Sequence, residues 1–148
     1  MYRGLDYWAN WSPIVQATEG RSSEVDEILA SLNFGIANPS ETWDGVRLSS
    51  GQINRFKRLY GQEILDEGMN LEQRIPYELK QAETDANSSG EPLLVGDKQK
   101  LISSIVERYR SMAKSIMVGG DDEEAGAEFP DLAAAMQRNR DIQKTYGR

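Results

Sequence analysis

The stretch from Trp43 to Ile64 constrains the fold most strongly, because independent local signals in it agree on one structure. Asp44-Gly45 is typical of a tight turn, and residues 46–48 form a short extended piece. Ser49 suits the N-cap of a helix, and Gln52 three residues later completes a capping box. Apolar residues then recur at helical spacing, at Ile53, Phe56, Tyr60 and Ile64. This stretch predicts a turn, a short strand and a helix that ends shortly after Ile64. It gives almost no evidence for a catalytic function.

The other periodic stretches also predict helices. Residues 25–32 have one apolar face behind a Ser-Ser cap. Asn70 is expected to cap the next helix, which Pro76 should kink or divide because proline has no backbone N–H. The composition of residues 85–92 predicts a loop. After this loop, Asp97 is expected to cap an amphipathic helix of about five turns.

The two ends of the chain differ from this helical middle. Residues 1–20 form an aromatic-rich docking segment, and residues 21–117 form the helical domain. Residues 118–128 form an acidic flexible linker, and residues 129–148 form a C-terminal docking helix with a thin apolar stripe. The predicted fold class is mainly α, a small irregular helical array with a short strand and turn leading into it.

We expect both ends of the chain to bind partners. Large aromatic and apolar side chains without a clear place in the helical domain are typical of interfaces. The candidate partner-binding residues at the two ends are Tyr7, Trp8, Trp11, Phe129, Leu132 and Met136. For the N-terminal aromatic residues, packing against the chain's own helices is an equally good alternative.

Composition argues against most catalytic functions. The chain has no histidine and no cysteine, so it has neither an imidazole base nor a thiolate nucleophile. It carries no phosphate-binding glycine loop and no dinucleotide fingerprint. The carboxylates at residues 121–124 lack the spacing of a calcium loop, and Glu63, Asp66 and Glu67 are interpreted as solvated charges at a helix end. We therefore expect no enzymatic activity, no cofactor and no metal.

Charge limits the partners further. The net charge of −7 disfavours a general nucleic-acid binder, and no apolar run is long enough to span a membrane. The main exception to this acidity is the basic group Arg55, Lys57 and Arg58, in which Arg55 and Arg58 share one side of the predicted helix. Pairing with acidic residues of the chain itself, or of a neighbour, explains these cations most simply. Arg55 and Arg58 are therefore candidate partner-binding residues, and DNA contact is kept as a minor alternative.

Two motifs resemble a pattern in the C-terminal parts of large tailed-bacteriophage virion proteins. Residues 45–49, Gly-Val-Arg-Leu-Ser, followed by the helix up to Gly61, are similar to its Gly-Val-x-Leu-Ser/Thr motif and the aromatic helix after it. Residues 98–114 are similar to a later helix of the type Lys-x-x-Leu-Ile-x-x-Ile-Val-x-x-Tyr-Arg-x-x-Ala-Lys. The chain departs from the pattern at residues 69–92, which are longer and more polar, and at Pro92-Leu93, where the Leu-Pro order is reversed.

The resemblance implies a non-enzymatic structural or interaction component of a phage virion. Such a protein would be an internal or ejection protein, or a tape-measure-like protein of the tail lumen, and no catalytic residues come with the resemblance. Its implied partners are other virion proteins in a symmetric oligomer. It also implies that the chain is either a shortened relative or a terminal segment of a longer protein. The alternative is a small acidic adaptor or regulator that binds one phage or host protein in the host cytoplasm during infection.

Overall fold

The computed structural model describes residues 24–119 and 126–146. This part of the chain is mainly helical with a short two-stranded antiparallel sheet, which confirms the predicted fold class. In chain order its elements are α3 (Glu24–Ser31), β1 (Thr42–Trp43), β2 (Val46–Arg47), α4 (Ser50–Gln62), α5 (Leu71–Ser89), α6 (Val95–Val118) and α7 (Pro130–Tyr146).

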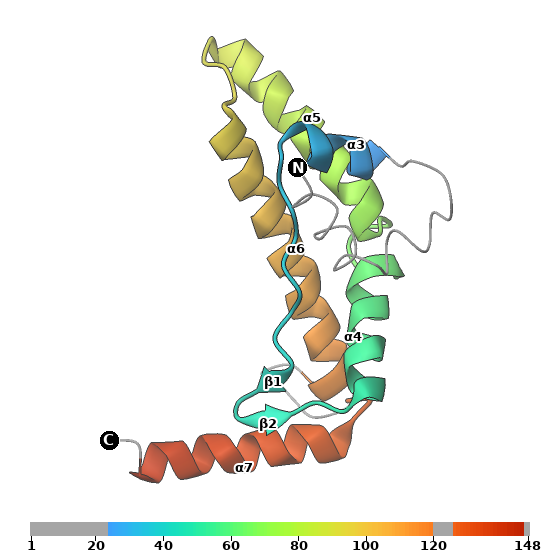
Figure 1. Cartoon of the computed structure of the whole chain (residues 1–148), viewed down its shortest axis with the longest axis vertical. Helices are drawn as coiled ribbons and strands as arrows, with labels where there is room; N and C mark the ends of the chain where they lie inside the picture. The colour runs from blue at the N-terminus through green and yellow to red at the C-terminus, as the bar shows by residue number, and fades with distance from the viewer. Residues whose placement is uncertain (1–23, 120–125, 147–148) are drawn as a thin grey trace.

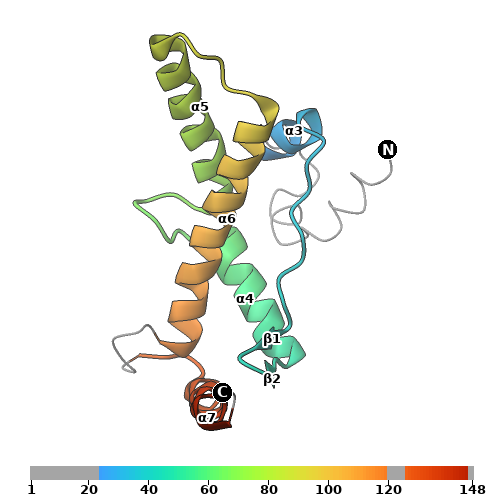
Figure 2. The ribbon, with the colours of Figure 1, turned by 90° about the vertical axis from the view of Figure 1, so that its left-hand side faces the viewer.

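The long helix α6 organises the arrangement of the other elements (Figure 1). Helices α4 and α5 follow one another along α6, which returns antiparallel to both, so α5 packs on its first half and α4 on its second half. Helix α3 packs on α5 beside the first half of α6, below the tip that the α5–α6 connection forms. Helix α7 lies across the other end and is seen almost along its axis in Figure 2. Among the described helices, none has both the length and the apolar content needed to cross a bilayer.

The predicted turn is the tip of a two-residue β-hairpin. Trp43 pairs with Val46, and Asp44 and Gly45 have positive φ angles of 48° and 80°. A type I′ turn requires this conformation at both positions, and it suits the right-handed twist of the flanking strands. A Cβ atom at Gly45 would also lie 3.0 Å from Asn139 Nδ2 of α7, so glycine allows α7 to approach the hairpin closely.

The predicted capping box at the start of α4 is confirmed. Ser49 Oγ accepts a hydrogen bond from the Gln52 backbone N–H at 3.1 Å, and Gln52 Oε1 accepts one from the Ser49 N–H at 2.8 Å. The predicted cap at Asn70 is confirmed too, and Gln73 completes a second capping box there. These caps satisfy backbone donors that have no partner inside the helix.

Helix α4 ends earlier than predicted. Its last residue is Gln62, after which the backbone of Glu63 is extended. The prediction for Ile64 was therefore wrong: it lies beyond the helix, and its side chain is 63% exposed. The chain instead makes a second tight turn, in which Glu67 and Gly68 have positive φ angles of 46° and 78°. The sequence signal for this turn is weak because glutamate rarely adopts positive φ.

Helix α5 is continuous through Pro76, so of the two predicted outcomes, a kink or a division into two helices, the division is wrong. Proline at this position removes one hydrogen bond to the carbonyl of Glu72. Leu71, Ile75 and Leu79 are all buried on the inner face of the same helix. We attribute the continuity to this burial, which outweighs the loss of one hydrogen bond.

The loop predicted for residues 85–92 was also largely wrong. Helix α5 continues to Ser89 and ends at Gly90, which has a left-handed φ of 83°. The backbone N–H of Glu91 donates to the carbonyl of Ala86 at 3.1 Å, as in a Schellman motif. The Ser-Ser-Gly sequence thus marks the end of a helix and not the middle of a loop.

Helix α6 begins two residues before Asp97, so this residue is not the N-cap that was predicted. The N-cap is Leu94, and Asp97 Oδ2 accepts a hydrogen bond from its backbone N–H at 3.2 Å. The carboxylate still satisfies a donor at the helix start, but from the third helical position.

The core follows the inner face of α6 from Ile102 to Met117 and continues into α7 at the end of that helix. Its most deeply buried side chains on α6 are Ile102, Ile105, Tyr109, Ala113 and Met117. Leu101, Met112 and Ile116 of the same helix pack against this core but are only partly buried. Contacts from α3, α4, α5 and α7 all join this cluster, so the described residues share one hydrophobic core.

Candidate interaction site between α6 and α7

Helix α7 packs on the chain itself through the apolar residues that were predicted to bind a partner. Leu132 is 4% exposed and Met136 is 2% exposed, and α7 contacts both α6 and β2. Phe129, just before α7, is partly buried, and its backbone N–H donates to the carbonyl of Met117 at 2.8 Å. Pro130 occupies the first helical position, where a backbone N–H would have no partner inside the helix. A partner could reach Leu132 and Met136 only if α7 left α6.

Arg55 is held by an ion pair within the chain. Its guanidinium donates from Nε and Nη2 to the two carboxylate oxygens of Glu128, at 2.9 and 2.7 Å. This bidentate pair confirms the simpler reading of Arg55, that an acidic residue of the chain itself pairs with it. Arg58, three residues later, is exposed and makes no ion pair among the described residues. The structure therefore does not bring Arg55 and Arg58 together on one ligand.

The Arg55–Glu128 pair also anchors the segment that leads into α7. The hydrogen bond from Arg55 lowers the pKa of Glu128, and the carboxylate raises the pKa of Arg55. The backbone N–H of Glu128 donates to the carbonyl of Ile116 at 3.1 Å. The last residues before α7 are thus fixed to α4 by a side-chain pair and to α6 by a backbone bond.

Replacing Glu128 with glutamine is expected to lower the free energy of unfolding at neutral pH by about 0.5–1 kcal/mol, because the pair is partly exposed to solvent. The folded-state pKa of Glu128 lies below its unfolded value, so its contribution is present above the unfolded pKa of about 4.3 and is lost as the pH falls through the folded pKa. Urea unfolding of both proteins between pH 3 and pH 7 should show the difference closing at the acid end. Glu63→Gln is the matched control, and an equal loss in that variant would contradict a specific role for the pair.

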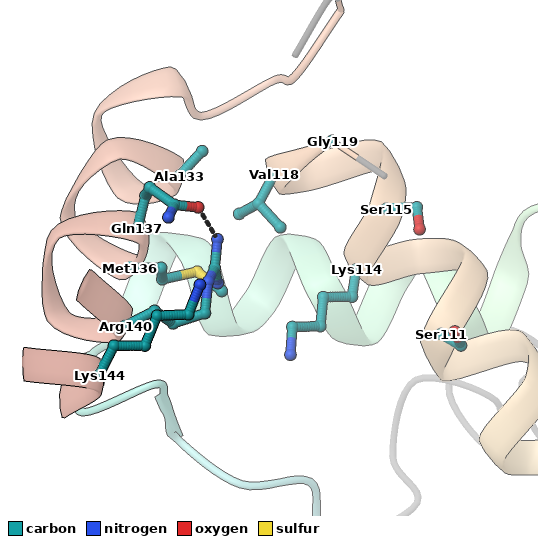
Figure 3. Close-up of a pocket in the computed structure, with 10 residues that line it drawn as sticks. All are labelled: Ser111, Lys114, Ser115, Val118, Gly119, Ala133, Met136, Gln137, Arg140 and Lys144. Carbon is teal, nitrogen blue, oxygen red and sulfur yellow. Dashed lines mark hydrogen bonds between the residues drawn. The ribbon is translucent and has the colours of Figure 1, made fainter. Parts of the chain in front are cut away.

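A groove of about 550 Å³ lies between the last turns of α6 and the inner face of α7 (Figure 3). Helix α6 contributes its wall residues up to Gly119, and α7 contributes the opposite wall. The residues that line it are Ser111, Lys114, Ser115, Val118, Gly119, Ala133, Met136, Gln137, Arg140 and Lys144. The described residues of its walls therefore combine three cations with hydroxyl and amide groups, and none of these residues is a carboxylate.

Each of the three cations in the groove has a different environment. Arg140 donates to Asp44 Oδ2 at 2.5 Å and to Gln137 Oε1 at 2.6 Å. The β1–β2 hairpin and α7 itself therefore fix the position of its guanidinium. Lys114 Nζ lies 5.1 Å from the centroid of the Trp43 ring, in a cation–π contact. Lys144 is exposed and makes no ion pair or hydrogen bond within the described part of the chain.

A second hollow of about 410 Å³ adjoins this groove and shares Ser111 and Lys114 with it. Trp43 and Phe56 line it, and their rings meet edge to face with centroids 5.1 Å apart. Arg110 lines it as well, and its guanidinium lies 4.8 Å from the Tyr60 ring centroid and donates to the Ala37 carbonyl at 2.6 Å. Glu107 also lines this second hollow, and its carboxylate lies 3.8 Å from Arg110 Nη1. The two hollows together place cations and one carboxylate beside aromatic surface, a combination typical of protein interfaces.

No family model, curated protein or solved structure matches the chain.

Several predicted site residues cannot be placed in this site. Tyr7, Trp8 and Trp11 lie outside the described residues, as do the carboxylates at 121–124. Among the described residues, no group of three or more acidic side chains is arranged to hold a metal ion. Lys114, Arg140 and Lys144 were not among the predicted site residues, because Lys114 and Lys144 are 30 positions apart and meet only once α7 folds across α6.

Proposed function

We propose that this chain is a non-enzymatic structural component of a tailed-bacteriophage virion, which acts by binding neighbouring virion subunits. The observation that carries the proposal is the placement of the two motifs that resemble phage virion proteins. The first comprises the hairpin and α4, and the second lies in α6. These two elements pack directly on each other, so the resemblance covers one contiguous structural unit and not two unrelated surfaces.

The surface of the chain supports a role in binding proteins. The α6–α7 groove presents cations and hydroxyl groups beside the ring of Trp43. Large apolar side chains are also exposed at separate places on the molecule: Ile64, Tyr77, Leu94, Val95 and Ile142. Contacts distributed in this way fit a subunit that touches more than one neighbour in an assembly.

Mass spectrometry of purified particles after amine-reactive cross-linking tests this proposal. We expect peptides of this chain in intact particles, with Lys144 in the groove cross-linked to another virion polypeptide. Lys100, which is exposed near the start of α6 and far from α7, is the matched control for random surface reaction. Detection of the chain only in infected-cell lysate, and never in particles, would contradict the virion assignment.

The alternative, a small acidic adaptor, is favoured by one observation. The described helices share a single hydrophobic core from α3 to α7, as expected of a chain that folds without a partner. A cooperative melting curve would be compatible with both functions. Particle composition distinguishes them, because an adaptor that binds one phage or host protein would be absent from mature virions.

A further inference from the structure

Helix α7 is joined to the rest of the chain by a narrow apolar contact. Over residues 130–145, Leu132 and Met136 are the buried side chains, whereas α6 buries side chains from Ile102 to Met117. The main contacts of α7 are with α6 and with β2. Residues 141–145 are all exposed, so the apolar contact is confined to the first half of α7.

The other contacts that hold the body of α7 are polar. Arg140 pairs with Asp44 of the hairpin, and their side chains are 44% and 35% exposed. An ion pair at this exposure contributes little to stability. Asn139 Nδ2 donates to the Asp44 carbonyl at 2.9 Å. Along the inner face of α7, the α6–α7 groove of about 550 Å³ takes the place of close packing between the two helices (Figure 3).

The base of α7 is held more firmly than the helix itself. The backbone N–H groups of Glu128 and Phe129 donate to carbonyls near the end of α6, at 3.1 and 2.8 Å. Helix α7 lies at one end of the molecule, and the main contacts of α3, α4 and α5 are with one another and with α6 (Figure 2). Movement of α7 about its first residue would therefore leave the contacts among the other helices intact.

We propose that α7 is an arm that leaves α6 and the hairpin from Pro130 onward while the rest of the chain stays folded. Opening exposes Leu132 and Met136, which the sequence predicts to bind a partner and which the closed chain covers. The chain thus covers its own candidate docking surface until the arm opens. Arm opening is a property of the chain alone, so it does not depend on the virion assignment.

Thiol reactivity measures the detachment of α7 directly, because the chain has no native cysteine. Leu132→Cys places a thiol at a position of α7 that is 4% exposed, and Val106→Cys places one on α6 at a position that is 3% exposed. In native buffer, we expect Ellman's reagent to modify the Leu132→Cys chain at least about tenfold faster than the Val106→Cys chain, since only the first thiol is uncovered without global unfolding. Far-UV circular dichroism should show unchanged helicity in both variants.

Native-state hydrogen exchange of the unmodified chain is the second test, because Leu132→Cys itself removes an apolar contact. Amides of residues 134–139 should exchange faster than those of residues 105–113. Their exchange rates should also be independent of urea at low urea concentrations, as expected for a local opening.

Asp44→Asn tests the contact that holds the body of the arm. It removes the charge that pairs with Arg140, while asparagine suits the type I′ turn of the hairpin. This variant should raise hydrogen exchange in α7 by about two- to fivefold and leave exchange in α6 unchanged. Glu128→Gln is the matched control, since it neutralises a pair of similar exposure at the fixed base of α7 and should not change exchange in the arm.

Equal modification rates of the two introduced thiols would overturn the inference, because α7 would then open only together with the core. Exchange in α7 with the same urea dependence as in α6 would overturn it as well. Fast exchange of the α7 amides beside a protected thiol at position 132 would also contradict it, since the helix would then fray in place without leaving α6.

Discussion

Replacing Phe56 with alanine is expected to lower the free energy of unfolding by about 3–5 kcal/mol, a large share of the total for a domain of this size. Phe56 is 4% exposed and lies between Trp43 and Tyr60, with ring centroids 5.1 and 5.0 Å away. The substitution leaves a cavity between the hairpin and α4, and both aromatic contacts are lost. Urea unfolding followed by far-UV circular dichroism should show a lower midpoint with an unchanged m-value.

Ile64→Ala is the control for this prediction, because Ile64 was placed on the same apolar stripe by its spacing but is 63% exposed in the structure. We expect a change within about 0.5 kcal/mol, as for most surface substitutions. Comparable losses in the two variants would mean that α4 extends to Ile64 and that the helix end described here is wrong.

The difference between Phe56 and Ile64 shows which features of the fold local sequence patterns predict and which they do not. Capping boxes, the Asp-Gly turn and apolar spacing are short-range features, and they predicted the starts of α4 and α5 and the hairpin turn correctly. Periodicity alone does not say where a helix stops, because an apolar residue can follow the last turn by chance. The chain leaves the helix at Glu63 because residues 66–69 form a turn that is held by side chains from α5 and α6.

Tertiary contacts also explain the failures in α5. The polar composition of residues 85–92 is common in loops, yet Gly90 stops the helix only at the end of that stretch. Pro76 is tolerated because neighbouring residues of α5 are buried against α3 and α6. The amino-acid composition of α5 predicts neither its end at Gly90 nor its continuation through Pro76, since both depend on the surface against which the helix packs.

The candidate site was still less predictable. Arg55 was singled out from the sequence, but its partner Glu128 is 73 residues away, in a segment read as solvated linker. The α6–α7 groove exists only because α7 folds across the end of α6, where Asn139 Nδ2 donates to the Asp44 carbonyl at 2.9 Å and Arg140 pairs with the Asp44 carboxylate. No local pattern at Asp44 distinguishes a turn residue that anchors a distant helix from one that faces only water.

The turn between α4 and α5 is organised by Arg74, the only charged side chain among the buried residues of the described chain. Arg74 Nη2 donates to the backbone carbonyl of Asp66 at 2.9 Å, and its guanidinium lies 3.5–3.6 Å from three carboxylates, those of Asp66, Glu67 and Glu78. Arg108 of α6 pairs with Asp66 and Glu78 from the other side. The Tyr109 hydroxyl donates to the Met69 carbonyl at 2.7 Å, so both arms of the turn are tied to α6 or α5.

Arg74→Ala should therefore lower the free energy of unfolding by about 2–4 kcal/mol, because it removes the buried partner of the Asp66 carbonyl and leaves Asp66 and Glu78 with Arg108 alone. Thermal and urea unfolding measure this loss, and hydrogen exchange should show earlier opening of the 66–69 turn than of α6. Glu67→Ala is the control: its carboxylate is 80% exposed, so we expect a loss of no more than about 0.5 kcal/mol. Arg74→Met separates charge from packing, because methionine retains apolar volume without a donor. If this variant were as stable as the wild type, the hydrogen bond and ion pairs of Arg74 would contribute nothing net, and the turn would be held by Arg108, Tyr109 and apolar burial.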